Sequence, residues 1–181
     1  MARKPAALIR VKPTSLESRL KKIKLLVIDV DGVMTDAGLF YVDPNGWTRR
    51  YSVYDGIGIK LALQLGFRVA VISAGSSDDI RNRCELLKIP DVHLGSEDKL
   101  PAYESLLAKY QLRDDEAAYI ADELFDLPVL RRVGVSASVP DAVDSVKAAV
   151  DFVTKRRGGS GAVREFIDRI RFAQKRGPEF P

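Results

Sequence analysis

The chain reads Ile23-Lys24-Leu25-Leu26-Val27-Ile28 and then Asp29-Val30-Asp31-Gly32-Val33-Met34-Thr35-Asp36. The first part is a short run rich in Ile, Leu and Val, which predicts a strand buried on both faces. Carboxylates at the end of such a strand cost free energy unless they are paired, hydrogen-bonded or bound to a metal. Two aspartates separated by one residue therefore favour a magnesium-dependent phosphoryl-transfer site at the carboxyl edge of a parallel sheet. The alternative is an ordinary strand-to-turn junction, because Asp and Gly are common turn residues.

The composition is that of one globular domain. The chain has 181 residues, of which 46% are hydrophobic and 30% are charged, so it can bury a sizeable core. We expect a single domain over residues 1–181, with a core over about 22–170 and basic tails at both ends. No apolar stretch approaches the roughly 20 residues that span a bilayer, and Arg10, Lys12 and Pro13 interrupt any signal-peptide core. Because the single cysteine, Cys84, excludes an intrachain disulfide, we expect a cytoplasmic protein.

The formal net charge is +4, and much of the basic excess lies near the two ends of the chain. A nucleic-acid-binding protein more often interleaves aromatic residues with its basic residues and carries a larger charge. Solvated tails are the simpler interpretation, so we expect neither nucleic acid nor a membrane as a partner. Attraction of an anionic substrate is compatible with the same charge.

The rest of the sequence predicts alternating helices and strands. Thr14-Ser15-Leu16-Glu17 has the spacing of a capping box, so a short helix should precede a first strand over residues 23–31. Asp43-Pro44-Asn45-Gly46 is a strong turn signal between residues 39–42 and 47–53, which together predict a β-hairpin. Further strands are expected at 68–73, 92–94, 117–121, 135–139 and 152–153. Further helices are expected near 57–65, 78–87, 99–110, 127–133, 142–149 and 162–174.

This alternation indicates an α/β fold with a parallel sheet and helices on both faces. The hairpin after the first strand is the one departure from the rhythm. In such a sheet the strand ends that carry Asp29 and Asp31, Ser73, and Asp122 lie along one edge, where function usually sits.

The two aspartates have distinct predicted roles. Asp29 is the candidate nucleophile, since carboxylates form aspartyl-phosphate intermediates. Asp31 is the candidate acid and base, which protonates the leaving alcohol and later activates water. Magnesium prefers oxygen ligands, and the carboxylate of Asp29, the carbonyl of Asp31 and a third acid would suffice. Asp122 is the best third acid, although an acidic start of a helix would look the same.

Further residues complete this set. Glu123 and Asp126 are candidates to orient a metal-bound water or a lysine from outside the metal's own ligands. The hydroxyl of Ser73 and backbone N–H groups beside it, at Ala74, are candidates to hold phosphoryl oxygens. Ser73 alone would more often be a helix cap. Lys99 can neutralise the phosphoryl group, although an isolated lysine is normally solvated surface.

Together these residues resemble the haloacid dehalogenase superfamily of phosphatases. Asp29-x-Asp31 resembles its first motif, Ser73 its second, Lys99 its third and Asp122 its fourth, in the same order and with similar spacing. The resemblance covers about residues 22–165. It implies a Rossmann-like domain that uses Mg²⁺ to hydrolyse phosphate esters.

A closer resemblance is to the 3-deoxy-D-manno-octulosonate 8-phosphate phosphatases. Nonulosonate 9-phosphate phosphatases and the tail domains of acylneuraminate cytidylyltransferases share the pattern. The segments that carry it are 31–36, the hairpin, Asp55-Gly56-Ile57-Gly58-Ile59-Lys60, Asp98-Lys99, Asp126-Leu127-Pro128 and Gly158-Gly159-Ser160-Gly161-Ala162-Val163-Arg164-Glu165. The resemblance implies a capless domain whose hairpins assemble a homotetramer, with a neighbouring subunit helping to close each active site. It also makes Asp55, Lys60 and Arg164 candidates for substrate binding.

Two positions depart from the family pattern. The second motif usually reads Thr-Gly-Arg, whereas this chain has Ser73-Ala74-Gly75, so the arginine expected near the anionic groups of the substrate is missing. Loss of such a clamp changes recognition more than chemistry. The fourth motif usually reads Gly-Asp-Asp, whereas here it is Ala121-Asp122-Glu123. Neither change removes the nucleophile, the acid and base, the hydroxyl or the lysine.

Other residues favour structural roles. Cys84 lies at helical spacing from Ile80 and Leu87, which predicts a core position. His93 is the only histidine and Cys84 the only cysteine, so we do not expect a zinc site of the usual kind. The Gly-rich segment 158–161 is either a connector or, as the resemblance suggests, a loop that faces the substrate.

Three hypotheses follow. The first is a magnesium-dependent phosphatase of 3-deoxy-D-manno-octulosonate 8-phosphate. The second is the same chemistry on a nonulosonate 9-phosphate or another sugar phosphate. The third is a non-catalytic tetrameric binding module, against which the intact Asp29, Asp31, Lys99 and Asp122 argue.

Overall fold

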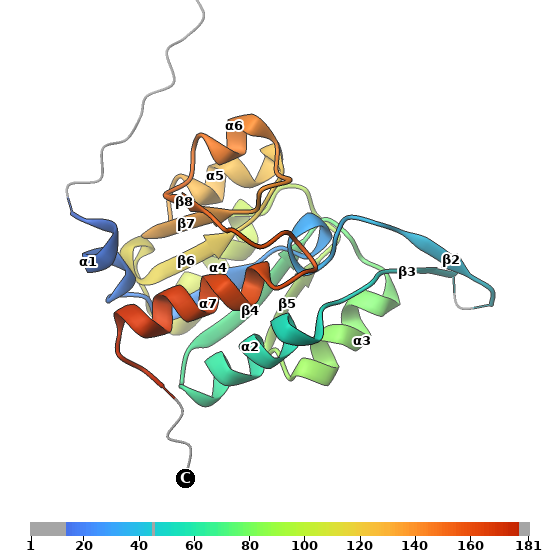
Figure 1. Ribbon diagram of the computed structural model, residues 1–181, viewed down its shortest axis with the longest axis horizontal. Coiled ribbons are helices and arrows are strands. Elements are labelled where there is room, and N and C mark those ends of the chain that lie inside the picture. The colour runs from blue at the N-terminus through green and yellow to red at the C-terminus, as the bar shows by residue number, and fades with distance from the viewer. Residues whose placement is uncertain (1–13, 45, 178–181) are drawn as a thin grey trace, which may run out of the picture.

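A six-stranded parallel sheet forms the centre of the protein, with helices on both faces (Figure 1). The computed structural model describes residues 14–44 and 46–177. The strand order is β5-β4-β1-β6-β7-β8, and every neighbouring pair is parallel. This confirms the predicted α/β fold.

The elements alternate along the chain as the sequence predicts. The strands of the main sheet are β1 (Leu25–Ile28), β4 (Arg68–Ser73), β5 (Asp91–Leu94), β6 (Ala117–Ile120), β7 (Val135–Ser138) and β8 (Phe152–Val153). The helices are α1 (Leu16–Leu20), α2 (Val53–Gln64), α3 (Asp78–Leu87), α4 (Leu100–Tyr110), α5 (Leu127–Leu130), α6 (Asp144–Lys147) and α7 (Ala162–Ala173).

The side chains of β1 supply both halves of the core, because successive residues of a strand point to opposite faces. Leu26 and Ile28 pack with apolar side chains of α2, α3 and α7. Leu25 and Val27 pack with side chains of α4, α5 and α6. All four are fully buried. Helices cover both faces of β1, so only the end of this strand is accessible. The candidate catalytic residues that follow the strand therefore lie at the edge of the sheet.

The first strand is shorter than predicted. It ends at Ile28 rather than at residue 31, because the chain turns over Val30–Met34. The Thr35 N–H donates to the carbonyl oxygen of Val30 at 3.1 Å, and Gly32 has a positive φ of 75°. Asp31 therefore lies in this turn and not on an extended strand.

Four other elements also differ from the prediction. The helix expected from residue 57 begins at Val53, because Ser52 precedes it and its hydroxyl accepts a hydrogen bond from the Asp55 N–H at 3.4 Å. The helices expected near 127–133 and 142–149 are only four residues long. The second hairpin strand ends at Thr48.

The predicted hairpin is present and lies apart from the main sheet (Figure 1). Its strands β2 (Phe40–Val42) and β3 (Gly46–Thr48) are antiparallel. Phe40, Tyr41 and Trp47 are 50%, 63% and 58% exposed. Large apolar side chains that gather on an exposed surface favour a protein partner.

Some predictions fall on residues that the structure does not describe. These are the basic residues of segment 1–13 and Asn45 of the hairpin turn. Within the described ranges, no helix is both long and apolar enough to cross a membrane.

Candidate active site

A buried lysine lies at the centre of the site. Lys99 precedes α4, and none of its side chain is exposed. Its Nζ atom lies 2.8 Å from Asp29 Oδ1 and 2.6 Å from Asp126 Oδ1. It also donates a hydrogen bond to the hydroxyl of Tyr119 at 3.2 Å. A buried ammonium requires such partners, because its desolvation is otherwise too costly.

The charges around Lys99 do not balance. Burial works against the charged form of Lys99, yet the carboxylates of Asp29 and Asp126 raise its pKa. Burial also raises the pKa of Asp29 well above its ordinary value, and the charge of Asp126 adds to this effect, while Lys99 opposes it. The ammonium of Lys99 is therefore the shared counter-charge of two buried carboxylates. The negative charge that it leaves unbalanced would stabilise a further cation bound here.

A third carboxylate completes an acidic cluster. Asp29, Asp122 and Asp126 each offer one carboxylate oxygen, and these three atoms lie within 4.8 Å of one another. Burial, followed by the charge of Asp126, raises the pKa of Asp122 to about 6. Gly32 makes the arrangement possible, because a Cβ atom at Gly32 would lie 2.0 Å from Asp122 Oδ2. Oxygen ligands of this kind suit magnesium, so the cluster fits the ion.

Asp126 is more tightly held than the other two members of the cluster. Its Oδ1 atom accepts a hydrogen bond from the Tyr119 hydroxyl at 2.5 Å, and its Oδ2 atom accepts one from the Glu123 N–H at 3.3 Å. The Glu123 carboxylate instead accepts from the Leu124 N–H at 2.7 Å. The two residues thus order the loop after β6.

The carboxylate of Asp31 pairs with a residue that the sequence did not predict. Arg49 Nε donates to Asp31 Oδ1 at 2.5 Å, and Arg49 Nη2 donates to Asp31 Oδ2 at 3.1 Å. Arg49 follows β3, 18 residues further along the chain. The chain between the two residues is a hairpin, so no sequence periodicity relates them.

The segment after β4 holds the second-motif residues. Ser73 is buried at the end of this strand, and its hydroxyl accepts a hydrogen bond from the Gly75 N–H at 3.1 Å. Ala74, between them, is half-buried. A Cβ atom at Gly75 would lie 3.2 Å from both Arg49 Nη2 and Asp31 Oδ2. The position that lacks the expected arginine therefore lies directly against another arginine.

Two of the three substrate-binding candidates, Asp55 and Arg164, contact each other, whereas the third, Lys60, takes no part in this contact. Asp55 is buried, and its carboxylate accepts hydrogen bonds from the N–H groups of Gly161 at 3.1 Å and Arg164 at 2.8 Å. It therefore caps the N-terminus of α7. Lys60 is exposed on α2.

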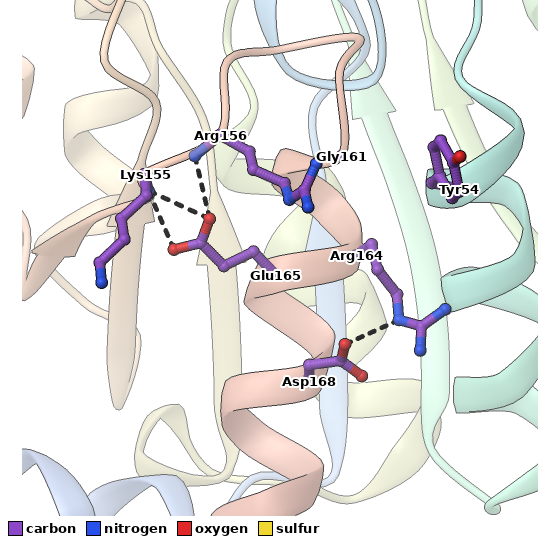
Figure 2. Close-up of a pocket in the computed structure, with 7 residues that line it drawn as sticks. All are labelled: Tyr54, Lys155, Arg156, Gly161, Arg164, Glu165 and Asp168. Carbon is purple, nitrogen blue, oxygen red and sulfur yellow. Dashed lines mark hydrogen bonds and ion pairs between the residues drawn. The ribbon is translucent and has the colours of Figure 1, made fainter.

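Arg164 lines a separate cavity of about 880 Å³ between α2 and α7 (Figure 2). Its guanidinium pairs with Asp168 at 2.8 Å. Lys155, Arg156, Glu165 and Tyr54 also line the cavity. None of the residues around Lys99 is among those lining it.

An aspartate pair after the first strand, a buried lysine and a further acid at the carboxyl edge of a parallel sheet define a class of phosphoryl-transfer enzymes. Residues 89–167 match the model of the haloacid dehalogenase-like hydrolases. The 3-deoxy-D-manno-octulosonate 8-phosphate phosphatase of Escherichia coli strain K12 is 39% identical over 158 residues, which cover 87% of this chain and 84% of that protein.

Solved structures are similar as well. One of them is the 3-deoxy-D-manno-octulosonate 8-phosphate phosphatase of Moraxella catarrhalis, which was solved with a magnesium ion, a phosphate ion and a KDO molecule. Its TM-score is 0.85 at 35% sequence identity, and the aligned residues cover 88% of this chain and 91% of the Moraxella chain. The cobalt-bound deoxy-D-mannose-octulosonate 8-phosphate phosphatase of Haemophilus influenzae has a TM-score of 0.82 at 39% identity, with coverage of 87% and 92%. The chain belongs to the haloacid dehalogenase-like hydrolases, in the family of the 3-deoxy-D-manno-octulosonate 8-phosphate phosphatases.

Proposed function

We propose that this protein is a magnesium-dependent phosphatase that hydrolyses 3-deoxy-D-manno-octulosonate 8-phosphate to the free sugar acid and phosphate. The main structural support for this chemistry is the position of Lys99, which is buried between Asp29 and Asp126 with Asp122 beside them. The relatives named above support the substrate and the cofactor.

The reaction proceeds in two displacements. Asp29 attacks phosphorus with its Oδ2 atom, since Oδ1 is held by Lys99 and by the Val30 N–H. The bond from phosphorus to the sugar oxygen breaks, and Asp31 gives its proton to that oxygen. Asp31 then takes a proton from water, which attacks phosphorus. The bond to Asp29 breaks, inorganic phosphate leaves, and both aspartates return to their starting state.

Charge on the phosphoryl oxygens must be offset in both steps. Lys99 supplies a fixed positive charge, while the hydroxyl of Ser73 and the N–H of Ala74 are candidates to donate hydrogen bonds. The carboxylates of Asp29 and Asp122 and the carbonyl of Asp31 are the proposed magnesium ligands. When bound there, magnesium acts as a Lewis acid that offsets charge on the transferring group.

The deciding experiment measures phosphate release from 3-deoxy-D-manno-octulosonate 8-phosphate with magnesium and with a chelator. Turnover should require magnesium and should fall by at least about 10³-fold in Asp29→Asn. Asp36→Asn is the matched control, because Asp36 lies in the same segment but pairs with Arg50 at the surface. Turnover of Asp29→Asn close to the wild-type value would refute the assignment of Asp29.

A second candidate substrate is a nonulosonate 9-phosphate or another sugar acid phosphate. Gly75 favours it, because the arginine expected near the anionic groups of the substrate is missing there. The ratio of kcat/KM over a panel of sugar phosphates decides between the two. A folded protein that turns over no member of the panel would instead support a non-catalytic binding module.

We further propose that the protein acts as a homotetramer in the cytoplasm. The exposed aromatic side chains of the hairpin support assembly. The lone, buried Cys84 is compatible with a reducing compartment.

A further inference from the structure

We infer that Arg49 is a positioning residue that fixes the carboxylate of Asp31 for proton transfer. This inference rests on the proposed function, because it assigns the support of a group that the reaction uses. The observation behind it is the two-point contact between the Arg49 guanidinium and both oxygens of Asp31.

Asp31 needs such support more than Asp29 does. The Asp31 side chain is 41% exposed, whereas that of Asp29 is 5% exposed. Within the described part of the chain, the hydrogen bonds and ion pairs of the Asp31 carboxylate all come from Arg49. A half-exposed carboxylate can adopt several rotamers, and a planar guanidinium that holds both oxygens selects one of them.

Arg49 is itself immobilised. Its side chain is only 7% exposed. Its Nη1 atom donates to Ser77 Oγ at 2.7 Å and to Asp79 Oδ1 at 3.1 Å. Ser77 donates in turn to Asp79 Oδ1 at 2.6 Å. Since Ser77 and Asp79 belong to the start of α3, the position of Asp31 is tied through Arg49 to a regular element of the fold.

Gly75 gives the guanidinium its space. A Cβ atom at this position would approach both Arg49 Nη2 and Asp31 Oδ2 to 3.2 Å and Ile80 Cδ1 to 2.8 Å. A long side chain at residue 75 would therefore have to displace Arg49. Because Arg49 is almost fully buried, it acts through Asp31 rather than by contact with the substrate.

The role predicts a loss of kcat rather than of binding. Misplacement of a proton donor by about 1 Å can lower the rate about 100-fold. We expect Arg49→Met to lower kcat by about 10- to 100-fold, with KM changed by less than about 3-fold. Arg49→Lys, which keeps the charge but loses the two-point contact, should recover only part of kcat. Arg50→Met is the matched control and should stay near wild type, because Arg50 pairs with Asp36 instead.

A double-mutant cycle separates positioning from a purely structural role. If Arg49 acts through Asp31, Arg49→Met should cost little further activity in an Asp31→Asn background. Circular dichroism checks that each variant is folded. A rise in KM with unchanged kcat, or losses that multiply in the double variant, would overturn the inference.

The same series is measured on p-nitrophenyl phosphate, a simple aryl phosphate. If the wild type hydrolyses this ester but no sugar acid phosphate, the proposed substrate is wrong while the Arg49 series still decides the inference. If the wild type hydrolyses neither, both proposals fail.

Discussion

Lys99 shows how one residue joins stability to chemistry at this site. An ammonium without solvent exposure is tolerated only because two carboxylates and a hydroxyl surround it. Those carboxylates raise its pKa against the effect of burial. The lysine therefore stays charged in the pH range in which phosphate esters are hydrolysed, and it holds Asp29 in place before any substrate arrives.

Lys99→Met should destabilise the protein even without substrate. Removal of the ammonium leaves Asp29 and Asp126 buried without their counter-charge, and this should lower the free energy of unfolding by about 3 kcal/mol. The measurement is urea unfolding at pH 7 in a chelator. Because the pKa of Lys99 in the folded state is above its ordinary value of 10.5, its contribution is fully present at pH 7 and is lost only as the pH rises through that range.

Lys22→Met is the matched control for this measurement. Lys22 also pairs with an aspartate, Asp115, but both side chains are about half exposed, at 50% and 42%. Its urea midpoint should stay near that of the wild type. Equal decreases in the free energy of unfolding of the two variants would show that the buried ion pairs of Lys99 stabilise the protein no more than an exposed ion pair does.

The sequence predicted part of the candidate site for a definite reason. Asp29 and Asp122 come together because Asp29 directly follows β1, Asp122 lies two residues after the end of β6, and these two strands are neighbours in the same parallel sheet. Lys99 reaches them from the start of α4. Arg49 was missed, since it reaches Asp31 through a hairpin whose orientation no periodicity encodes. Asp55 was proposed as a substrate ligand, and its two backbone contacts favour a capping role instead.

At the scale of elements, the alternation of apolar runs predicted the strands and most helices. The errors lie where local signals compete with tertiary contacts. Val30 and Asp31 were predicted to end the first strand, yet the chain turns over Val30–Met34, and Gly32 in this turn lies against the side chain of Asp122. The N-terminus of α7 is similar, since its cap comes from Asp55, 106 residues away from Gly161. Such long-range caps leave no trace in a local pattern.

Asp55→Ala should expose the cost of that long-range cap. The Gly161 and Arg164 N–H groups lose their acceptor, so the free energy of unfolding should fall by about 1 to 2 kcal/mol. Asp55→Asn, which keeps one acceptor oxygen, should lose less. Urea unfolding at pH 7 measures both variants, with Asp78→Ala on the exposed start of α3 as the control. Unchanged stability in Asp55→Ala, together with a raised KM, would return Asp55 to the substrate-binding role.

At the scale of the whole molecule, the described residues of a single chain leave the apolar side chains of the hairpin exposed to water. Tyr41 and Trp47 contact each other edge to face at a centroid distance of 5.4 Å, yet each is more than half exposed. Tyr54 and Ile57 of α2 are also exposed, at 67% and 51%. A water-exposed apolar surface of this kind is stabilised when a second copy covers it.

Trp47→Ser should therefore weaken assembly without unfolding the chain. Light scattering coupled to size-exclusion chromatography should give about four times the chain mass of 20.0 kDa for the wild type and a smaller mass for the variant. Thermal unfolding of the dissociated variant should remain cooperative, because Trp47 contributes little to the core of its own chain. Phe172→Ser on α7 is the control, since Phe172 is exposed to a similar extent, at 62% against 58% for Trp47, but lies on another element. A wild type with the mass of one chain, or a Trp47→Ser variant with unchanged mass, would contradict assembly through the hairpin.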